Sequence, residues 1–326
     1  MRKLLLLFYL LLFSSEHALS SEIRPIAIVT GGTRGIGSGI AQVLAEDGYD
    51  LLLTYNTDQV SATKFAQSLV DMDKGTRTCT SSNSSPIRVE CVGGDISLSS
   101  TRDEIFKRLD YMMKHDNEST LAILVHNAGQ YVGVTSDNVE NIKAGKKPLA
   151  FGDGSLIGDD GRTNFETMHY YQRMYGEAFI DLSERSLARM DQSGANGGGS
   201  IVGISSPGVT AHYYGPDPGY SMPGSGKCLM EYSMRIYAAK VAHRGINVNV
   251  IVPGVTKTAA WNRLAKSMGM EDEMKMMDGL VQNRVPLKKM IEPRDIGGVV
   301  KFLCSDVGKF ITGIVLPVDG GLHLKR

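Results

Sequence analysis

The chain has 326 residues, and its 35 lysine and arginine residues equal its 35 aspartate and glutamate residues. Because proteins that bind the phosphate backbone of nucleic acid carry a basic surplus, this balance argues against a nucleic-acid partner. The length suits one α/β domain that carries an insertion. Cys91, Cys228 and Cys304 lie among apolar residues and are expected to pack in the core. His126 and His212 have no partners at metal-ligand spacing, so we expect no metal site.

Residues 1–20 have the composition of a targeting segment. Arg2 and Lys3 precede an apolar run of ten residues from Leu4 to Phe13, and a polar stretch with small residues follows. This order is typical of a secretory signal peptide, which would send the domain 21–326 to the secretory pathway and the endoplasmic reticulum. The run is short for a bilayer span, because a transmembrane helix needs about 20 apolar residues. The alternatives are an uncleaved membrane anchor and the first half of a bipartite organelle-import signal.

The segment from Ile26 to Gly37 predicts the opening of a dinucleotide-binding βαβ unit. The apolar run 26–29 is typical of a strand that is buried on both faces of a parallel sheet. Gly31 and Gly35 let the backbone turn tightly, and Gly37 lets the following helix lie close to the sheet. N–H groups at the start of that helix would then face a pyrophosphate. A tight turn without a ligand is the alternative, because a glycine-rich turn alone is a weak signal.

The end of the next strand indicates which nicotinamide cofactor is preferred. The segment 50–56 predicts a buried strand, and it ends without the acidic residue that would accept hydrogen bonds from the ribose 2′-hydroxyl of NAD. Asp58 lies two positions beyond Asn56. Arg34, inside the glycine turn, could meet a 2′-phosphate with its planar guanidinium, although a solvated surface arginine is the alternative. Both features favour NADPH or NADP+ over NADH.

Further segments extend the alternation of strands and helices. Helices are predicted at 60–70 and 105–113, and buried strands at 87–92 and 121–125. Four strands that alternate with helices define a doubly wound parallel sheet. The sequence therefore predicts a protein of the α/β class.

Five motifs follow one another along the chain at characteristic intervals. They are Thr30-Gly-x-x-x-Gly35-x-Gly37, Asp95, Asn127-Ala128-Gly129, Asn249-x-Ile251-x-Pro253-Gly254 and Val318-Asp319-Gly320-Gly321. In order and spacing they resemble the short-chain dehydrogenase/reductase family, from Ile26 to the C-terminus. The resemblance implies a single-domain Rossmann fold, a doubly wound parallel sheet of about seven strands, with the cofactor and substrate sites at its carboxyl edge.

The same resemblance implies a set of cofactor contacts. Asp95 and Ile96 would lie by the adenine, Asn127 would brace the strand beside the cofactor, and residues 255–256 would approach the nicotinamide carboxamide. The residues expected to bind the cofactor are Gly31, Thr33, Arg34, Gly35, Ile36, Gly37, Asn56, Asp95, Ile96, Asn127, Ala128, Gly129, Lys227, Pro253, Gly254, Val255 and Thr256.

The catalytic set departs from the common pattern of the family. Ser206, at the end of the apolar segment 201–206, matches the catalytic serine. Pro223 stands four residues before Lys227, where the common Tyr-x-x-x-Lys pattern has its tyrosine, and proline has no acid to give. Tyr220 stands seven residues before Lys227, and this Tyr-x6-Lys spacing resembles the divergent branch that contains the bacterial enoyl-acyl-carrier-protein reductases. Residues i and i+7 share a helix face, so both side chains can reach one cofactor. Pro223 suits a first helical turn, which places Tyr220 just ahead of the helix.

A second departure supports that branch. The usual catalytic asparagine of the family lies on the helix before the serine strand, here within 165–190. Aligning that helix from its end puts Tyr175 at the asparagine position, and no asparagine is near. Enoyl reductases of the family also lack it. A proton relay through asparagine is therefore not expected, which weakens the simple ketone-reductase interpretation without excluding it.

The three matched residues suggest how the reaction would proceed. Hydride transfer to a carbonyl or a conjugated alkene puts negative charge on an oxygen, and a phenol can protonate it if its pKa, about 10 when unperturbed, is lowered. Lys227 would lower that pKa for Tyr220 and would hold the nicotinamide ribose hydroxyls. Ser206 could be a second donor to the oxygen. Tyr213 and Tyr214 are rival acids.

Two stretches are expected to shape the substrate pocket. Residues 130–163 form an insertion with many charged side chains, which would be a lid, an oligomer contact or a plain solvated loop. Residues 261–280 carry five methionines in the place of the family's mobile substrate flap. There they could adapt to an apolar ligand, or they could face the core of an amphipathic helix.

Together these patterns predict an NADPH-dependent oxidoreductase that transfers hydride to the carbonyl or conjugated 2-enoyl group of a small-molecule substrate. The alternative, motivated by Pro223 and the missing asparagine, is a catalytically weakened NADP(H)-binding sensor or scaffold. We expect a homodimer or homotetramer, and a membrane contact only through an uncleaved N-terminal segment.

Overall fold

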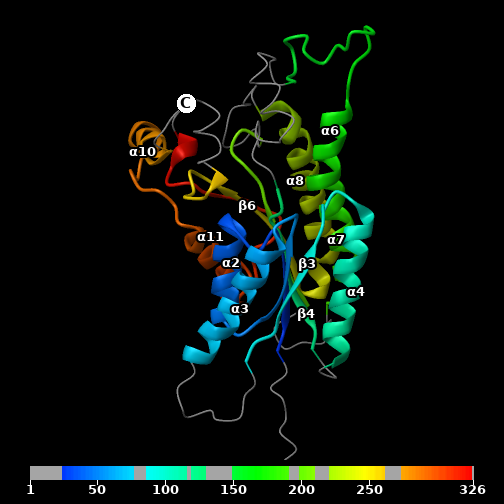
Figure 1. The fold of residues 1–326 in the computed structure, drawn as a ribbon, viewed down its shortest axis with the longest axis vertical. Helices are drawn as coiled ribbons and strands as arrows, with labels where there is room; N and C mark the ends of the chain where they lie inside the picture. The colour runs from blue at the N-terminus through cyan, green and yellow to red at the C-terminus, as the bar shows by residue number, and fades with distance from the viewer. Residues whose placement is uncertain are drawn as a thin grey trace, which may run out of the picture.

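The computed structural model of the protein consists of one twisted parallel sheet with helices on both faces (Figure 1). It describes residues 24–76, 86–115, 119–129, 149–190, 198–209, 220–260 and 273–324. The predicted signal segment 1–20, His212, the rival acids Tyr213 and Tyr214, and most of the insertion lie outside these residues. Within them, no helix combines the length and the apolar character that a bilayer span requires.

The sheet has the topology of a doubly wound dinucleotide-binding fold. Its strands are β1 (Ile26–Thr30), β2 (Asp50–Tyr55), β3 (Val89–Gly93), β4 (Leu121–His126), β5 (Gly199–Ile204), β6 (Ile246–Pro253) and β7 (Val315–Val318). All pair in parallel, in the order β3-β2-β1-β4-β5-β6-β7. The predicted seven-stranded Rossmann sheet is therefore confirmed. The connections reverse direction between β1 and β4, and such a switch point opens a crevice at the carboxyl ends of the strands.

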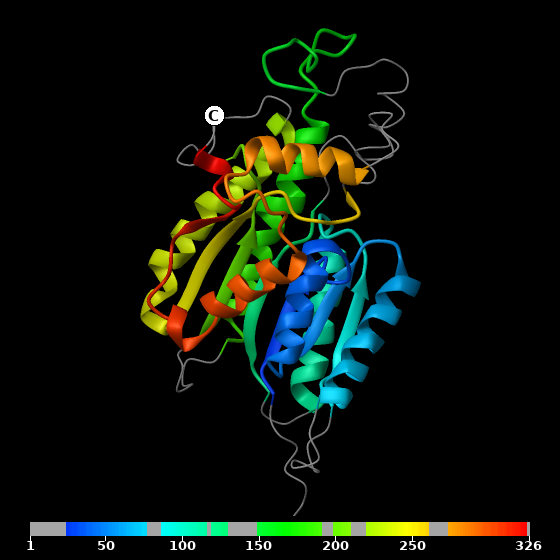
Figure 2. The same cartoon turned by 90° about the vertical axis from the view of Figure 1, so that its left-hand side faces the viewer.

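The helices divide between the two faces of the sheet (Figures 1 and 2). One face carries α2 (Gly35–Glu46), α3 (Gln59–Thr76) and α11 (Pro293–Leu303), and the other carries α4 (Ser99–His115), α7 (Ala178–Leu187) and α8 (Ser221–Val241). The segments α6 (Glu166–Tyr171) and η1 (Gln172–Glu177) lead into α7, and α10 (Glu273–Arg284) lies beyond the carboxyl edge. Short 3-10 turns are η3 (Ala242–Arg244), η4 (Asp306–Gly308) and η5 (Leu322–Leu324).

The alternation of apolar side chains along the strands explains the two layers. Ile26 and Ile28 of β1 belong to the cluster under α4, α7 and α8, whereas Ala27 and Val29 belong to the cluster under α2 and α11. Successive side chains of a strand point to opposite faces, so a continuous apolar run is buried on both. Every residue of β1 is fully buried, including the polar Thr30 at its end.

Helices α2 and α11 pack in close contact at two glycines, Gly39 and Gly297, where a larger residue would clash. A Cβ atom built at Gly39 would lie 2.2 Å from the backbone of Pro293, and one at Gly297 would lie 2.6 Å from the carbonyl oxygen of Gly39. Figure 2 shows α11 lying directly against α2. Two ion pairs flank the contact, Glu46 with Arg294 and Asp47 with Lys301.

The helix before β5 is not regular. The sequence predicts one helix within 165–190, but the middle of it, η1, is a π-helix. A π-turn inserts one extra residue per turn and shifts the faces of the two flanking helices relative to each other, and such turns are frequent at functional sites. The inserted residue cannot be inferred from apolar periodicity.

The structure tests the predicted packing of the cysteines and of one methionine. Cys91 and Cys304 pack against the core, but the expectation for Cys228 is wrong, because that thiol is exposed. Cys228 follows the buried Lys227 on α8 by one residue, and a step of one residue along a helix leads to another face. Met277 of α10 is buried against Val281, so this methionine faces a small core. The methionines at 268 and 270 lie outside the described residues.

Candidate active site

The glycine turn after β1 presents a helix N-terminus whose N–H groups have no side-chain cap. Gly31 and Gly35 have φ angles of 61° and 56°, which disfavour other residues. A Cβ atom at Gly37 would lie 2.1 Å from the carbonyl oxygen of Gly31, so only glycine fits there. Arg34 occupies the N-cap position of α2 and its side chain makes no capping hydrogen bond. Since the first N–H groups of a helix lack intrahelical acceptors, this turn can bind an anion such as a pyrophosphate.

Hydrogen bonds tie the glycine turn to both neighbouring strands. The Thr30 hydroxyl oxygen accepts bonds from the backbone N–H groups of Asn127 (3.0 Å) and Ala128 (2.9 Å). The amide of Asn127 donates to the carbonyl oxygens of Thr30 and Gly31, both at 3.1 Å. The Gly31 N–H donates to the hydroxyl of Thr54 at the end of β2 (2.9 Å). Asn127 therefore lies where the sequence expects it, at the brace between β4 and the turn.

His126 extends this brace to the next layer. Its Nδ1 lies 3.1 Å from the Thr30 hydroxyl, and its Nε2 lies 3.1 Å from the carbonyl oxygen of Met174 in η1. A carbonyl only accepts, so Nε2 carries the proton, and Nδ1 accepts from Thr30. Complete burial holds the pKa of His126 at about 3, so the ring is neutral. It is a structural residue, as the sequence predicts.

Two charged side chains lie near the end of β2, the guanidinium of Arg34 and the carboxylate of Asp58. Arg34 and Asn56 are exposed there. Asp58 accepts a hydrogen bond from the backbone N–H of Ser61 (3.0 Å), at the start of α3. That bond lowers the pKa of the Asp58 carboxyl, and the nearby Arg34 lowers it further. Asp58 is therefore placed as a helix cap, which leaves Arg34 as the charged group of the turn.

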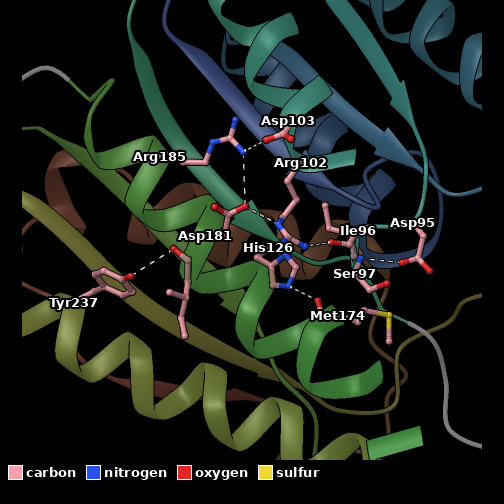
Figure 3. A network of polar contacts seen from close by, with 11 residues as sticks. Asp95, Ile96, Ser97, Arg102, Asp103, His126, Met174, Asp181, Arg185 and Tyr237 are labelled. Carbon is pink, nitrogen blue, oxygen red and sulfur yellow. Dashed lines mark hydrogen bonds and ion pairs between the residues drawn. The ribbon is translucent and has the colours of Figure 1, made fainter. Parts of the chain in front are cut away.

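The loop that begins at Asp95 is fixed from two sides, and Figure 3 shows the side of Arg102. The guanidinium of Arg102 donates to the carbonyl oxygen of Ile96 (2.8 Å) and to the carboxylate of Asp181 on α7 (2.6 Å). The hydroxyl of Tyr170 donates to Asp95 (3.2 Å), and burial together with Asp95 raises the pKa of Tyr170 to about 12. Tyr170 and Arg102 could not be predicted as site residues, because nothing in the local sequence indicates contacts across 75 and 79 positions.

Lys227 lies on the buried face of α8, at the carboxyl end of β5. Its Nζ donates to the carbonyl oxygen of Ile204 (2.5 Å) and lies 3.9 Å from the centre of the Tyr175 ring. Tyr175 in turn packs against Gly129, where a Cβ atom would lie 2.9 Å from the ring. Burial lowers the pKa of Lys227 to about 7, and the carboxylate of Glu231 opposes this shift. The ends of β4 and β5 and the π-helix η1 thus meet at this amine.

The other two proposed catalytic residues flank this point. Tyr220 is the N-cap residue of α8, half-buried and two helical turns before Lys227. Pro223 stands in the first turn of that helix, as predicted. Ser206 is half-buried and follows, by two residues, the carbonyl of Ile204 that Lys227 binds.

The segment after β6 closes the same edge of the sheet. A Cβ atom at Gly254 would lie 2.6 Å from the Cα of Asp319, so β6 and the loop after β7 are in direct backbone contact. Val255 and Thr256 are buried, and the Thr256 hydroxyl donates to the carbonyl of Gly254 (3.1 Å). A Cβ atom at Gly35 would lie 3.5 Å from Thr258, which brings this segment beside the glycine turn.

Residues predicted for the site therefore lie at one edge of one sheet, although they come from distant parts of the chain. The turns after β1, β3, β4, β5 and β6 carry nearly all of them, and α8 carries Tyr220 and Lys227. Asn56 is exposed beyond β2 and takes part in none of the hydrogen bonds described above. The site also contains two residues that were not predicted, Glu231 and Ser205, whose side chains bond to each other beside Lys227. An acidic residue four positions after a buried lysine is the signal that could have indicated them.

This topology and this glycine turn define a dinucleotide-binding Rossmann protein. Two family models match the chain, one described as short chain dehydrogenase over residues 25–144 and one described as Enoyl-(Acyl carrier protein) reductase over residues 163–323. The chain is 31% identical over 300 residues to the 3-oxoacyl-[acyl-carrier-protein] reductase FabG of Haemophilus influenzae, with 92% of this chain and 98% of that protein covered.

It is also 29% identical to the hydroxynaphthalene reductase-like protein Arp2 of Metarhizium brunneum, over 94% of this chain and 98% of that protein. Among solved structures, L-sorbose reductase from Gluconobacter frateurii complexed with NADPH and L-sorbose superposes with a TM-score of 0.70, at 20% identity over 94% of this chain and 99% of that one. The chain belongs to the short-chain dehydrogenase/reductase family and is an NAD(P)H-dependent oxidoreductase.

Proposed function

We propose that the protein uses NADPH to reduce a carbonyl or a conjugated 2-enoyl group of a small or medium apolar compound. The observation that carries this proposal is the position of the buried Lys227. It lies two helical turns after Tyr220, and it binds the carbonyl of Ile204, which is two residues before Ser206. NADPH, when bound, supplies the hydride, and the protein's own residues bind, orient and protonate.

Each of the three residues would have a distinct task. Tyr220 would donate a proton to the oxygen that gains negative charge, since its phenol starts the helix that carries Lys227. Lys227 would hold the nicotinamide ribose hydroxyls and place a positive charge beside the phenol. Ser206 would donate a second hydrogen bond to the same oxygen, as hydroxyl donors do in oxyanion sites.

The residues of the glycine turn fit a dinucleotide with a 2′-phosphate. The uncapped N-terminus of α2 suits the pyrophosphate, and Asp95 and Ile96 would border the adenine. The exposed Arg34 suits the 2′-phosphate, because a guanidinium binds phosphate through two parallel hydrogen bonds. The carboxylate of Asp58 caps α3 by accepting from the N–H of Ser61, a role other than ribose binding. The NADPH complex of L-sorbose reductase supports this preference.

A sensor or scaffold that binds NADP(H) without turnover is the second candidate. The enclosure of the Lys227 amine favours it, because that amine already contacts the Ile204 carbonyl and the Tyr175 ring. Tyr175 also stands where the family's usual asparagine would be expected. The two candidates differ in turnover and agree in cofactor binding.

One experiment separates the candidates and the two reactions. The purified protein is titrated with NADPH by fluorescence, and NADPH oxidation is then followed with a panel of ketones, aldehydes, 3-oxoacyl thioesters and 2-enoyl thioesters. With C4-deuterated NADPH, NMR places deuterium on the carbinol carbon after carbonyl reduction and on the β-carbon after enoyl reduction. Tight NADPH binding without oxidation by any compound would favour the sensor, and the absence of NADPH binding would refute both.

Oligomeric state and location belong to the same proposal. We expect a homodimer or homotetramer in solution, which light scattering at defined concentrations tests. We also propose that residues 1–20 direct the chain to the secretory pathway, with a bipartite organelle import signal or a membrane anchor as the alternatives. Protein purified from its own cells should then begin near Ser21, whereas an intact Met1 on a soluble cytosolic product would contradict targeting.

A further inference from the structure

A second buried charge lies one helical turn beyond Lys227. Glu231 occupies position i+4 on α8, and it is 8% exposed while Lys227 is 4% exposed. Residues i and i+4 of a helix are neighbours on one face. The hydroxyl of Ser205 donates a hydrogen bond to Oε1 of Glu231, and Ser205 is the first residue after β5. Lys227 binds the carbonyl of Ile204, the residue just before. The two α8 side chains therefore hold successive residues of the same strand end.

The other groups that the structure describes around Lys227 supply no negative charge. The π-helix η1 contributes the uncharged ring of Tyr175, and β4 contributes His126, which is neutral because it is fully buried. Among the described titratable groups, Glu231 is the only acid that acts on the pKa of Lys227. Glu231 itself faces Arg235 and the exposed Cys228 along α8. Burial raises the pKa of its carboxyl, whereas the Ser205 hydrogen bond, Lys227 and Arg235 lower it.

We propose that Glu231 is a positioning residue of the active site, an inference that rests on the function proposed above. Its carboxylate keeps the Lys227 amine charged and, through Ser205, fixes the strand end that carries Ser206.

The physical reason is the cost of enclosing an ammonium group in protein. A buried amine without a counter-charge sheds its proton, because the low polarity of the interior penalises the charged form. The Tyr175 ring favours a cation through its π face, but it carries no net charge. Glu231 supplies the missing charge, and its bond to Ser205 couples that charge to the geometry of the strand end. Proton donation by Tyr220 and ribose binding both depend on a charged Lys227, so Glu231 would act on both through Lys227.

Four variants separate these roles. Glu231→Gln keeps the shape and removes the charge, and Glu231→Asp keeps the charge with a shorter side chain. Ser205→Ala removes only the hydrogen bond to the strand end. Glu184→Gln is the matched control, because the Glu184 carboxylate also binds α8, by accepting a bond from the Tyr237 hydroxyl (2.8 Å), but away from Lys227.

Two quantities are measured between about pH 6 and about pH 9, the range in which a perturbed lysine titrates. The first is the NADPH dissociation constant from cofactor fluorescence, and the second is the single-turnover rate of NADPH oxidation. NADPH affinity should fall above a certain pH, which we call the midpoint. In Glu231→Gln, we expect this midpoint to lie about one pH unit lower than in wild type, and the rate near neutral pH to be about tenfold lower. The sign follows because removal of a negative charge lowers the pKa of a lysine.

The other variants have defined expectations. Glu231→Asp should shift the midpoint to lower pH by less than Glu231→Gln does, because it keeps the charge but holds it farther from Lys227. Ser205→Ala should lower the rate without moving the midpoint, and Glu184→Gln should change neither. The inference is overturned if the Glu231→Gln midpoint matches wild type, or if only its melting temperature changes. If Glu231→Gln fails to fold, the midpoint of Glu231→Asp decides: a shift of the midpoint to lower pH on shortening the side chain supports the role, and identity to wild type with a lower melting temperature refutes it. If wild type binds NADPH but oxidises it with no substrate, the proposed function fails, and the binding midpoints still decide this inference.

Discussion

Substitution of Gly37 by alanine is the sharpest test of the glycine turn. The new Cβ would lie 2.1 Å from the carbonyl oxygen of Gly31 and 2.6 Å from the amide nitrogen of Asn127. The first contact is with backbone, so it cannot be relieved by a side-chain rotation. Either α2 moves away from the sheet, or the turn moves and the hydrogen bonds from Asn127 to Thr30 and Gly31 are lost.

The magnitude follows from three contributions. Overpacking costs about 1–3 kcal/mol, and each lost hydrogen bond about 0.5–1.5 kcal/mol. Alanine in a helix returns about 1 kcal/mol relative to glycine. The net loss in the free energy of unfolding is about 2 kcal/mol, which lowers the melting temperature of a domain of about 300 residues by roughly 3 °C. NADPH affinity should fall by at least about tenfold, since the displaced atoms are the N-terminus of α2.

Gly298→Ala is the matched control. Gly298 also lies inside a helix, α11, but a Cβ there would meet nothing within 4 Å. The same substitution should raise the free energy of unfolding by roughly 0.5–1 kcal/mol and leave NADPH binding unchanged. Thermal unfolding by circular dichroism and NADPH titration by fluorescence measure both variants. Equal melting temperatures for the two variants, with NADPH affinity within twofold of wild type in both, would refute the reasoning.

Three further substitutions test the site. Tyr220→Phe should lower single-turnover NADPH oxidation by roughly 10²–10⁴-fold while the NADPH dissociation constant hardly changes, because only the proton donor is lost. Arg34→Ala should weaken NADPH by about tenfold and leave NADH unaffected, which paired fluorescence titrations measure. Arg102→Met should weaken NADPH by roughly tenfold, because the carbonyl of Ile96 and the carboxylate of Asp181 both lose their buried donor.

Each of these has its own control. Tyr232→Phe removes a hydroxyl from an exposed tyrosine of the same helix and should leave the rate intact. A Tyr220→Phe rate above about a third of wild type would show that another group is the acid. For Arg34, an equal loss of NADPH and NADH affinity would rule out a 2′-phosphate contact. Arg185→Met removes the pairing with Asp103 but no bond to the loop that begins at Asp95, so it should bind NADPH normally.

The strands were predictable from sequence because their physics is local. The apolar runs 26–29 of β1 and 51–53 of β2 are buried, as such short runs are in a parallel sheet that is covered on both faces. The position of Tyr220 was also predictable, since Pro223 fixes where α8 begins. Helix ends were less certain: α3 continues to Thr76, six residues beyond the predicted end. Its last turns carry no apolar periodicity to mark them.

What could not be predicted depends on contacts between distant residues. Asp58 carries the carboxylate that a ribose ligand needs, and only the fold shows that this carboxylate caps α3 by accepting from the N–H of Ser61. Tyr170 lies 75 positions from the carboxylate that it contacts. The π-turn at η1 leaves no mark in the periodicity of apolar residues, yet it is the element that presents Tyr175 to Lys227. Cys228 is exposed although it directly follows the buried Lys227, and only the orientation of α8 about its axis determines which of the two side chains is buried.

The glycine-mediated contact between α2 and α11 has a consequence for the order in which the chain folds. The ion pair between Glu46 and Arg294 spans 248 positions, and that between Asp47 and Lys301 spans 254. During synthesis, α2 is made early, but its packing partner α11 is made only when nearly the whole chain has been synthesised. Contacts of such separation slow folding, and until they form an apolar helix face is open to aggregation. We therefore expect α2, which begins at the glycine turn, to complete its packing only after α11 has been synthesised.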